Sequence, residues 1–249
     1  MEKPSAKRLI LYFLLTAIFS PMLVSCSVLH FIFDGEEQQT TIRDEEYSID
    51  SNTILANISQ GDIQVFNLLM ATPPVYPPLS DSVKWGQDDF CKVAQAFYSA
   101  ILKEKIADWQ LTEIAFNLKC DEIDKGPQYV RFGFFRYLVV KKENVRLKRD
   151  LFITPNQNLV VFSETEYQPV YEKWSVIDPS KIKIKIEDAL EIAENNQGKE
   201  FRQQVDNQCS ISANLDANGK YSDGWFVAYT ELSDQQTKRL WLIIDIQQV

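Results

Sequence analysis

Residues 113–120 read Glu113-Ile114-Ala115-Phe116-Asn117-Leu118-Lys119-Cys120, with a large apolar or thiol side chain at every second position. Successive side chains of a strand point to opposite faces, so this alternation predicts a β-strand with one face in a core. The stretch before it predicts a helix that Asp88-Asp89 can open. The apolar positions of that helix are Phe90, Val93, Ala94, Phe97, Ile101 and Leu102.

The rest of the chain continues and then repeats this order. Aromatic and branched residues predict further strands after a turn at 124–127, and a second helix opened by Glu187-Asp188 precedes a second group of strands. Gly198 suits the C-terminal cap of the second helix, and Asn218-Gly219 predicts a hairpin. The predicted strands cover 129–140, 145–153, 159–162, 205–215, 224–230 and 238–246. We therefore expect an α+β fold of tandem helix-on-antiparallel-sheet units.

The second unit carries Ile186-Glu187-Asp188-Ala189-Leu190-Glu191-Ile192-Ala193, then Gly198, Gly224-Trp225-Phe226-Val227-Ala228-Tyr229 and Leu242-Ile243-Ile244-Asp245-Ile246. This pattern resembles a PepSY-like module, and the first unit is similar to a more distant copy. The resemblance implies an extracytoplasmic α+β domain of a kind often proposed to inhibit or restrain peptidases. It implies no catalytic residues.

The N-terminal segment carries Lys3, Lys7 and Arg8 and then an apolar run from Leu9 to Val24. A basic start, a short apolar stretch and a small residue before the cut are typical of a secretory signal. The uninterrupted apolar stretch is shorter than the roughly 20 residues that span a bilayer. The tetrapeptide Leu23-Val24-Ser25-Cys26 resembles a bacterial lipobox, which implies lipidation of Cys26 and membership of the bacterial lipoproteins. The alternatives are an ordinary signal peptide and an uncleaved anchor.

These patterns together predict the organisation of the chain. We expect a signal peptide over 1–25, an acidic flexible stalk over 26–53, and a small segment with a proline-rich connector over 54–85. The first helix-plus-sheet unit then covers 86–173, and the second, PepSY-like unit covers 174–249. The protein would be held on the cell membrane by lipid and would face away from the cytoplasm. Ser27 is similar to the sorting signal for the outer membrane, if the source has two membranes.

Charge restricts the class of partner. Residues 1–25 carry a net charge of +2, so their removal from a chain of net charge −9 leaves −11. An acidic body has no electrostatic attraction to nucleic acid and little to an anionic membrane. Lipid, not charge, is therefore expected to hold it at the membrane.

Three cysteines follow Cys26: Cys91, Cys120 and Cys209. They can remain as buried thiols that behave like small apolar side chains. In an oxidising compartment a pair can close instead, and a Cys91–Cys120 bridge would tie the first helix to the next strand.

The side chains available for catalysis are few. The single histidine, His30, lies near the lipidation site, so Ser-His-Asp, Cys-His and histidine-zinc mechanisms have no base or ligand in the folded body. Asp88-Asp89 and Glu187-Asp188 open helices, where acidic residues favour the helix dipole. We predict no catalytic residues, no cofactor and no metal, and hence a protein that is not an enzyme.

Two further groups of residues have a structural and a functional interpretation. The basic residues Lys141, Lys142, Arg146, Lys148 and Arg149 are typical of a solvated hairpin. The aromatic residues Tyr129, Phe132, Phe134, Phe135 and Tyr137 suit cross-strand pairs in a core, or the lining of a ligand groove. The sequence thus predicts a lipid-anchored binding or interaction protein of the bacterial cell envelope. The alternatives are a regulator of an envelope protease and, more weakly, a carboxylate-based hydrolase.

Overall fold

The strand predicted at 113–120 is β3 (Gln110–Lys119), and it lies inside a large sheet with a neighbour on each side. The computed structural model describes residues 38–69, 74–140, 143–168, 174–220, 222–233 and 238–247. The predicted signal peptide, Cys26 and His30 lie outside these residues, so the predictions made for them stay predictions.

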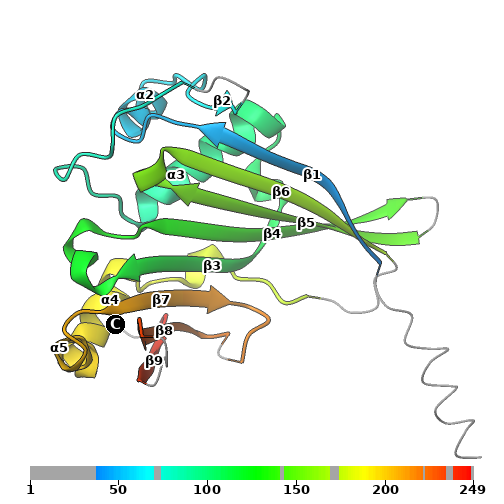
Figure 1. Ribbon diagram of the computed structural model, residues 1–249. Coiled ribbons are helices and arrows are strands. Elements are labelled where there is room, and N and C mark those ends of the chain that lie inside the picture. The colour runs from blue at the N-terminus through cyan, green and yellow to red at the C-terminus, as the bar shows by residue number, and fades with distance from the viewer. Residues whose placement is uncertain are drawn as a thin grey trace, which may run out of the picture. The chain divides into compact units, whose positions relative to one another are not determined.

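The sheet has nine strands in the order β2-β1-β6-β5-β4-β3-β7-β8-β9 (Figure 1). Pairing is antiparallel from β6 through to β9 and between β1 and β2. The other strands are β1 (Gln38–Ser48), β2 (Asn67–Leu68), β4 (Tyr129–Val140), β5 (Glu143–Thr154), β6 (Leu159–Gln168), β7 (Cys209–Asp216), β8 (Gly224–Glu231) and β9 (Arg239–Asp245).

The predicted tandem helix-on-sheet units are wrong as a description of the fold. β3 pairs with β7 as well as with β4, so one sheet runs across the boundary that the sequence predicted at 173/174. The described residues from Gln39 onward belong to one compact unit. The physical reason is that two separate sheets would expose β3 and β7 as edge strands, whose backbone groups seek a partner. Their mutual pairing removes both edges.

The predicted flexible stalk over 26–53 is corrected for its second part. Residues 38–48 form β1, which takes its place beside β6 in the sheet. Its last residues enter the core, where Tyr47 packs edge-on against Phe97 with 5.1 Å between ring centroids. Acidic composition alone suggested a solvated segment, but the alternation of Arg43, Glu45 and Tyr47 places these three side chains on one face of a strand.

Among the described residues, four α-helices accompany the sheet: α2 (Ile54–Ser59), α3 (Gln87–Phe97), α4 (Ile186–Ala193) and α5 (Lys199–Gln204). The expected starts of α3 and α4 are confirmed, since Asp88 and Asp89 lie in the first turn of α3, and Glu187 and Asp188 in that of α4. The Asp89 side chain accepts a hydrogen bond from the Gly86 amide at 3.1 Å, which satisfies an amide that the helix leaves free.

Gly198 differs from its prediction as a helix C-cap. Its backbone angles are helical, and the chain passes through it from the turn after α4 into α5. A Cβ atom at this position would lie 2.5 Å from Tyr229 Oη and 2.7 Å from the Ala193 carbonyl oxygen. Glycine is required here by close approach, not by a left-handed conformation.

The cysteines form one pair and leave one free, which is the second interpretation of the sequence, but the pair is not Cys91–Cys120. Cys120 and Cys209 form a disulfide with 5.2 Å between their Cα atoms, and Cys91 is free. The register of β3 and β7 pairs Lys119, the last residue of β3, with Ser210, so Cys120 directly after β3 lies beside Cys209. A Cys91–Cys120 bridge is wrong because the strand that receives Cys120 is β7, which the two-unit prediction had placed in another sheet.

Candidate functional site

A cavity of about 660 Å³ lies between α3 and the sheet, and we call it the apolar cavity. Most of its wall is aliphatic or aromatic, with a few polar side chains. Its lining residues are Gln87, Asp88, Cys91, Ala94, Gln95, Ile106, Ala107, Trp109, Gln110, Leu111, Ile114, Phe132, Phe134, Val176, Ile177, Pro179, Ile182 and Lys185. The volume and the composition are those of a site for a small ligand.

The cavity exists because of the side chains with which α3 meets the sheet. Phe90 packs on Phe116 with 5.9 Å between ring centroids, and Phe97 packs on Phe162 with 5.6 Å. These two large residues are spaced by two helical turns and hold the helix away from the strands. Ala94 lies between them and lines the cavity. A small side chain between two large ones leaves space that no protein atom fills.

The polar groups of the apolar cavity come from the first turn of α3 and from the residue before α4. Asp88 Oδ2 accepts a hydrogen bond from Lys185 Nζ at 2.6 Å, and both side chains are solvent-exposed. Gln87 is buried, and its Oε1 accepts from the Ile186 amide at 2.9 Å. The Asp88 partner raises the pKa of Lys185. The apolar cavity thus combines an ion pair and a buried side-chain amide with a mostly apolar wall.

Cys91 lines the same cavity, and its surroundings do not favour a catalytic thiolate. Burial, with smaller contributions from the charges of Asp88 and Glu187, raises the pKa of its thiol to about 11. Since the thiolate is the reactive species, the thiol is mostly protonated at neutral pH and reacts slowly.

One wall of the cavity comes from the segment that leads to α4. Ile177 is buried, and its amide donates to the Leu111 carbonyl at 2.8 Å, which attaches the segment to β3. Phe132 and Phe134 form the floor from β4 and are themselves buried. The sequence predicts that these aromatic residues lie in a core or line a groove, and Phe132 and Phe134 do both.

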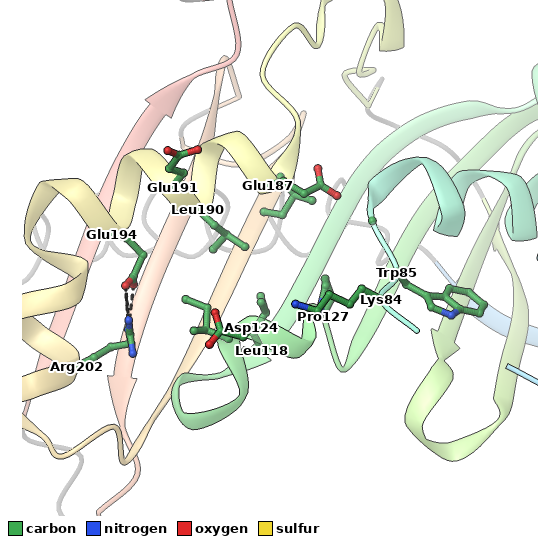
Figure 2. A pocket seen from close by; sticks show the side chains of 14 residues that line it. Lys84, Trp85, Leu118, Asp124, Pro127, Glu187, Leu190, Glu191, Glu194 and Arg202 are labelled. Carbon is green, nitrogen blue, oxygen red and sulfur yellow. Dashed lines mark hydrogen bonds and ion pairs between the residues drawn. The ribbon is translucent and has the colours of Figure 1, made fainter. Parts of the chain in front are cut away.

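A second cavity of about 440 Å³ lies beside α4, and we call it the helix-interface cavity (Figure 2). It has four carboxylate side chains in its wall. The full lining is Lys84, Trp85, Gly86, Leu118, Ile123, Asp124, Gly126, Pro127, Ile186, Glu187, Leu190, Glu191, Glu194 and Arg202.

The carboxylates of the helix-interface cavity are engaged with the protein itself or point apart. Glu187 accepts from the Gln87 amide at 2.6 Å, which caps α3. Glu194 accepts two hydrogen bonds from Arg202 Nε at 3.0–3.1 Å and one from Tyr229 Oη at 2.9 Å. Figure 2 shows Glu191 directed away from Asp124. This arrangement joins elements together and does not aim two carboxylates at one point.

The acidic pairs Asp88-Asp89 and Glu187-Asp188 lie at the helix starts, as predicted, and side chains of both pairs bond other parts of the protein. Asp89 bonds the Gly86 amide, Asp88 bonds Lys185, and Glu187 bonds the Gln87 amide. Across the described residues, no group of three or more His, Cys, Asp or Glu side chains is placed to hold a metal ion.

A charged cluster surrounds the buried Arg149 on β5, and no local sequence pattern predicts it. Arg149 is only 5 % exposed, and its guanidinium donates to Glu164 and, at 3.1 and 3.2 Å, to both oxygens of Glu104. It stacks 3.7 Å from the Trp109 ring centroid, and Arg136 approaches the same ring at 4.6 Å. The indole nitrogen of Trp109 donates to Glu104 at 2.7 Å. Arginine suits such a place because its planar fork pairs with carboxylates and stacks on rings.

Arg146, also on β5, is 1 % exposed. Its guanidinium lies 3.6 Å from the Trp174 ring centroid and 5.0 Å from that of Tyr167. The predicted solvated hairpin is therefore wrong for Arg146 and Arg149, while Lys141 and Lys142 lie outside the described residues. The signal that could have indicated this is the number of aromatic residues on the neighbouring strands.

No protein-family model, no curated protein and no solved structure matches this chain. Within the part of the chain that the structure describes, no helix is long and apolar enough to cross a membrane.

Proposed function

We propose that the protein is a lipid-anchored binding protein of the bacterial cell envelope and that its ligand occupies the apolar cavity. The observation that carries the proposal is the cavity itself, with about 660 Å³ between α3 and the sheet. A concave and mostly apolar pocket of this size with a few polar groups is the usual form of a small-ligand site. The polar groups present form ion pairs and helix caps, which suits binding better than catalysis.

The extracytoplasmic location is supported by two independent features. The lipobox-like Leu23-Val24-Ser25-Cys26 supplies an anchor, and two or more acyl chains make membrane attachment stable. The Cys120–Cys209 disulfide is of a kind that persists in oxidising compartments outside the cytoplasm. The body contributes little to membrane attachment because its net charge is negative.

The lining restricts the class of ligand. Ile114, Phe132 and Phe134 offer apolar surface, whereas Asp88 and Lys185 place one charge of each sign at the side of the cavity. A small molecule with an apolar body and one polar end matches this distribution.

Binding is tested with N-phenyl-1-naphthylamine, an apolar dye whose fluorescence rises when it leaves water. We expect the full-length protein to bind it and Cys91→Phe, which fills the cavity, to weaken binding at least 10-fold. Cys91→Ser is the matched control, because it keeps the volume and should bind within about 2-fold of the parent. Equal binding by Cys91→Phe would contradict the assignment of the site.

The same cysteine reports occupancy without a change of sequence. A ligand in the cavity should slow the reaction of the Cys91 thiol with a maleimide, since Cys91 is part of the wall. Labelling that proceeds at the same rate with and without saturating dye would place the dye elsewhere.

The anchor is tested separately in the producing cell. Cys26→Ala should leave an unprocessed precursor that lacks acyl chains, whereas Ser27→Ala should be processed and retained in the membrane. Unchanged mobility and membrane retention of Cys26→Ala would refute lipidation.

Two other functions stay predictions. Regulation of an envelope protease, which the PepSY resemblance implies, requires that the purified protein slow such a protease. A carboxylate-based hydrolase requires turnover that is lost when the paired carboxylates Asp88-Asp89 or Glu187-Asp188 are replaced by their amides.

A further inference from the structure

β9 is the last strand in the order of the sheet, and it pairs with β8 on one side (Figure 1, red). Among the described residues, no strand pairs with its other edge. Such an edge offers a row of backbone donors and acceptors to another chain. At the opposite end of the sheet β2 pairs with β1 only at Tyr47 and Ser48, so most of β1 also has no strand on its outer side among the described residues. That part of β1 is mostly polar and exposed, which suits a solvated edge.

The hydrogen bonds between β8 and β9 show which residues of β9 direct their backbone groups to the outer edge of the sheet. The Glu231 amide donates to the Lys238 carbonyl at 3.1 Å, and the Ile246 amide donates to the Asp223 carbonyl at 3.3 Å. In an antiparallel ladder alternate residues bond the same neighbour, so the even-numbered residues of β9 bond β8. The odd-numbered residues therefore direct their amides and carbonyls outward.

The odd-numbered side chains share the exposed face of β9. Trp241 is 60 % exposed and Ile243 is 50 % exposed, whereas Ile244 is buried on the other face. Read along the strand, this face carries Arg239, Trp241, Ile243 and Asp245. A cation and an anion thus enclose two large apolar side chains.

This order is self-complementary. When two copies of β9 run antiparallel about a twofold axis at Leu242, Trp241 lies opposite the partner's Ile243 and Arg239 lies opposite the partner's Asp245. The same register places odd-numbered residues against odd-numbered residues, which lets their outward backbone groups bond one another. A shift of two residues in either direction sets Trp241 against itself or Ile243 against itself and separates the charges.

We infer that β9 is a homodimer interface, at which a second copy of this chain extends the sheet in this register. Cross-strand pairs of an aromatic with a β-branched residue, and of opposite charges, stabilise such a ladder. A twofold contact uses the same edge of both copies, so this contact closes as a dimer. The contact lies outside the apolar cavity, whose lining contains no residue of β9.

The interface is tested with the full-length protein in detergent, by sedimentation and light scattering over a range of concentrations. We expect a dimer whose dissociation constant rises at least 10-fold in Trp241→Glu. Val139→Glu is the matched control, because Val139 is an apolar residue of β4 that is 74 % exposed, and it should leave the dimer unchanged. Dye binding and the circular dichroism spectrum of both variants should match the parent, which separates loss of the dimer from loss of the fold.

Charge reversal tests the register. Arg239→Asp and Asp245→Arg should each weaken the dimer, and the double variant should restore it. Leu242→Cys, made in a Cys91→Ser background, should form a disulfide between copies on oxidation, since the register sets the two Leu242 residues opposite each other. A monomer at high concentration, a dimer that persists in Trp241→Glu, or no crosslink at Leu242→Cys would each overturn the inference.

Discussion

The pairing of β3 with β7 divides the sheet into two parts, which we call the first half (β2-β1-β6-β5-β4-β3) and the second half (β7-β8-β9). Each half is accompanied by a helix, α3 or α4, but the two helices contact the strands through side chains of opposite size. α3 uses Phe90 and Phe97, which stand the helix off and leave the apolar cavity beside Ala94. α4 uses the buried Ala189 and Ala193, and the turn after it uses Gly198 in direct contact with Tyr229. One sheet can thus have a large, mostly apolar cavity under one helix and close contact with small residues of another. The size of the contacting residues decides which.

The halves also differ in how they place charge. β5 buries Arg146 and Arg149 among aromatic rings, whereas the ion pair of Arg202 with Glu194 lies nearer to solvent. Four predictions follow from these contrasts.

The largest expected effect comes from the bond that joins the halves. Cys120→Ala with Cys209→Ala should lower the free energy of unfolding by about 4–5 kcal/mol, because the disulfide spans 89 residues and restricts the unfolded chain. Denaturant unfolding of the double variant measures this, with Cys91→Ala as the control that should change little. A loss below about 1 kcal/mol would show that the pairing of β3 with β7 holds the two halves together without help from the disulfide.

The contrast in buried charge is tested by paired substitutions. Arg149→Met should cost about 3–5 kcal/mol, since it leaves Glu104 and Glu164 without their shared buried cation. Arg202→Met should cost less, about 1–2 kcal/mol, because its ion pair with Glu194 is better solvated. Equal losses in the two variants would remove the distinction between the halves. The measurement is again the free energy of unfolding in denaturant.

The contrast in packing is tested by adding carbon atoms on each side. Gly198→Ala should destabilise the protein by about 1–3 kcal/mol, because its Cβ would overlap Tyr229 and the Ala193 carbonyl. Ala94→Leu should change stability by less than about 1 kcal/mol, since the added atoms enter the apolar cavity. The same Ala94→Leu variant should lose dye binding. If it instead destabilises more than Gly198→Ala, the space beside α3 is smaller than the structure indicates.

The smallest expected effect is a dependence on pH that belongs to the first half. Burial by itself would raise the pKa of Glu104, but hydrogen bonds from Arg149 and Trp109 and the charges of Arg149 and Arg136 outweigh it and lower that pKa. A carboxylate with a lowered pKa stabilises the folded state above its unfolded pKa, and this contribution is lost as pH falls through the folded value. The free energy of unfolding should therefore decline below about pH 4.5. Glu104→Gln should show a shallower decline over the same range, and an identical slope would contradict this assignment.

How much of the molecule could be predicted depends on whether a feature is local. The strand at 113–120, the starts of α3 and α4 and the hairpin between β7 and β8 follow from side-chain period and turn residues, which act over a few positions. The candidate site is intermediate. Phe132 and Phe134 were identified as possible lining, but Ala94 and Ile177 become lining only because α3 and the segment before α4 face each other across the sheet.

Local sequence patterns were enough to predict most of the strands after residue 110, the starts of α3 and α4 and which faces are apolar, whereas the location suggested by Cys26 stays a prediction. The pairing of β3 with β7, the resulting Cys120–Cys209 bond and the burial of Arg146 and Arg149 among aromatic rings follow only from the folded chain. The physical reason is that strand pairing and burial of charge join residues far apart in the chain. Their free energy depends on which edges and rings become neighbours. No pattern confined to one segment contains that information.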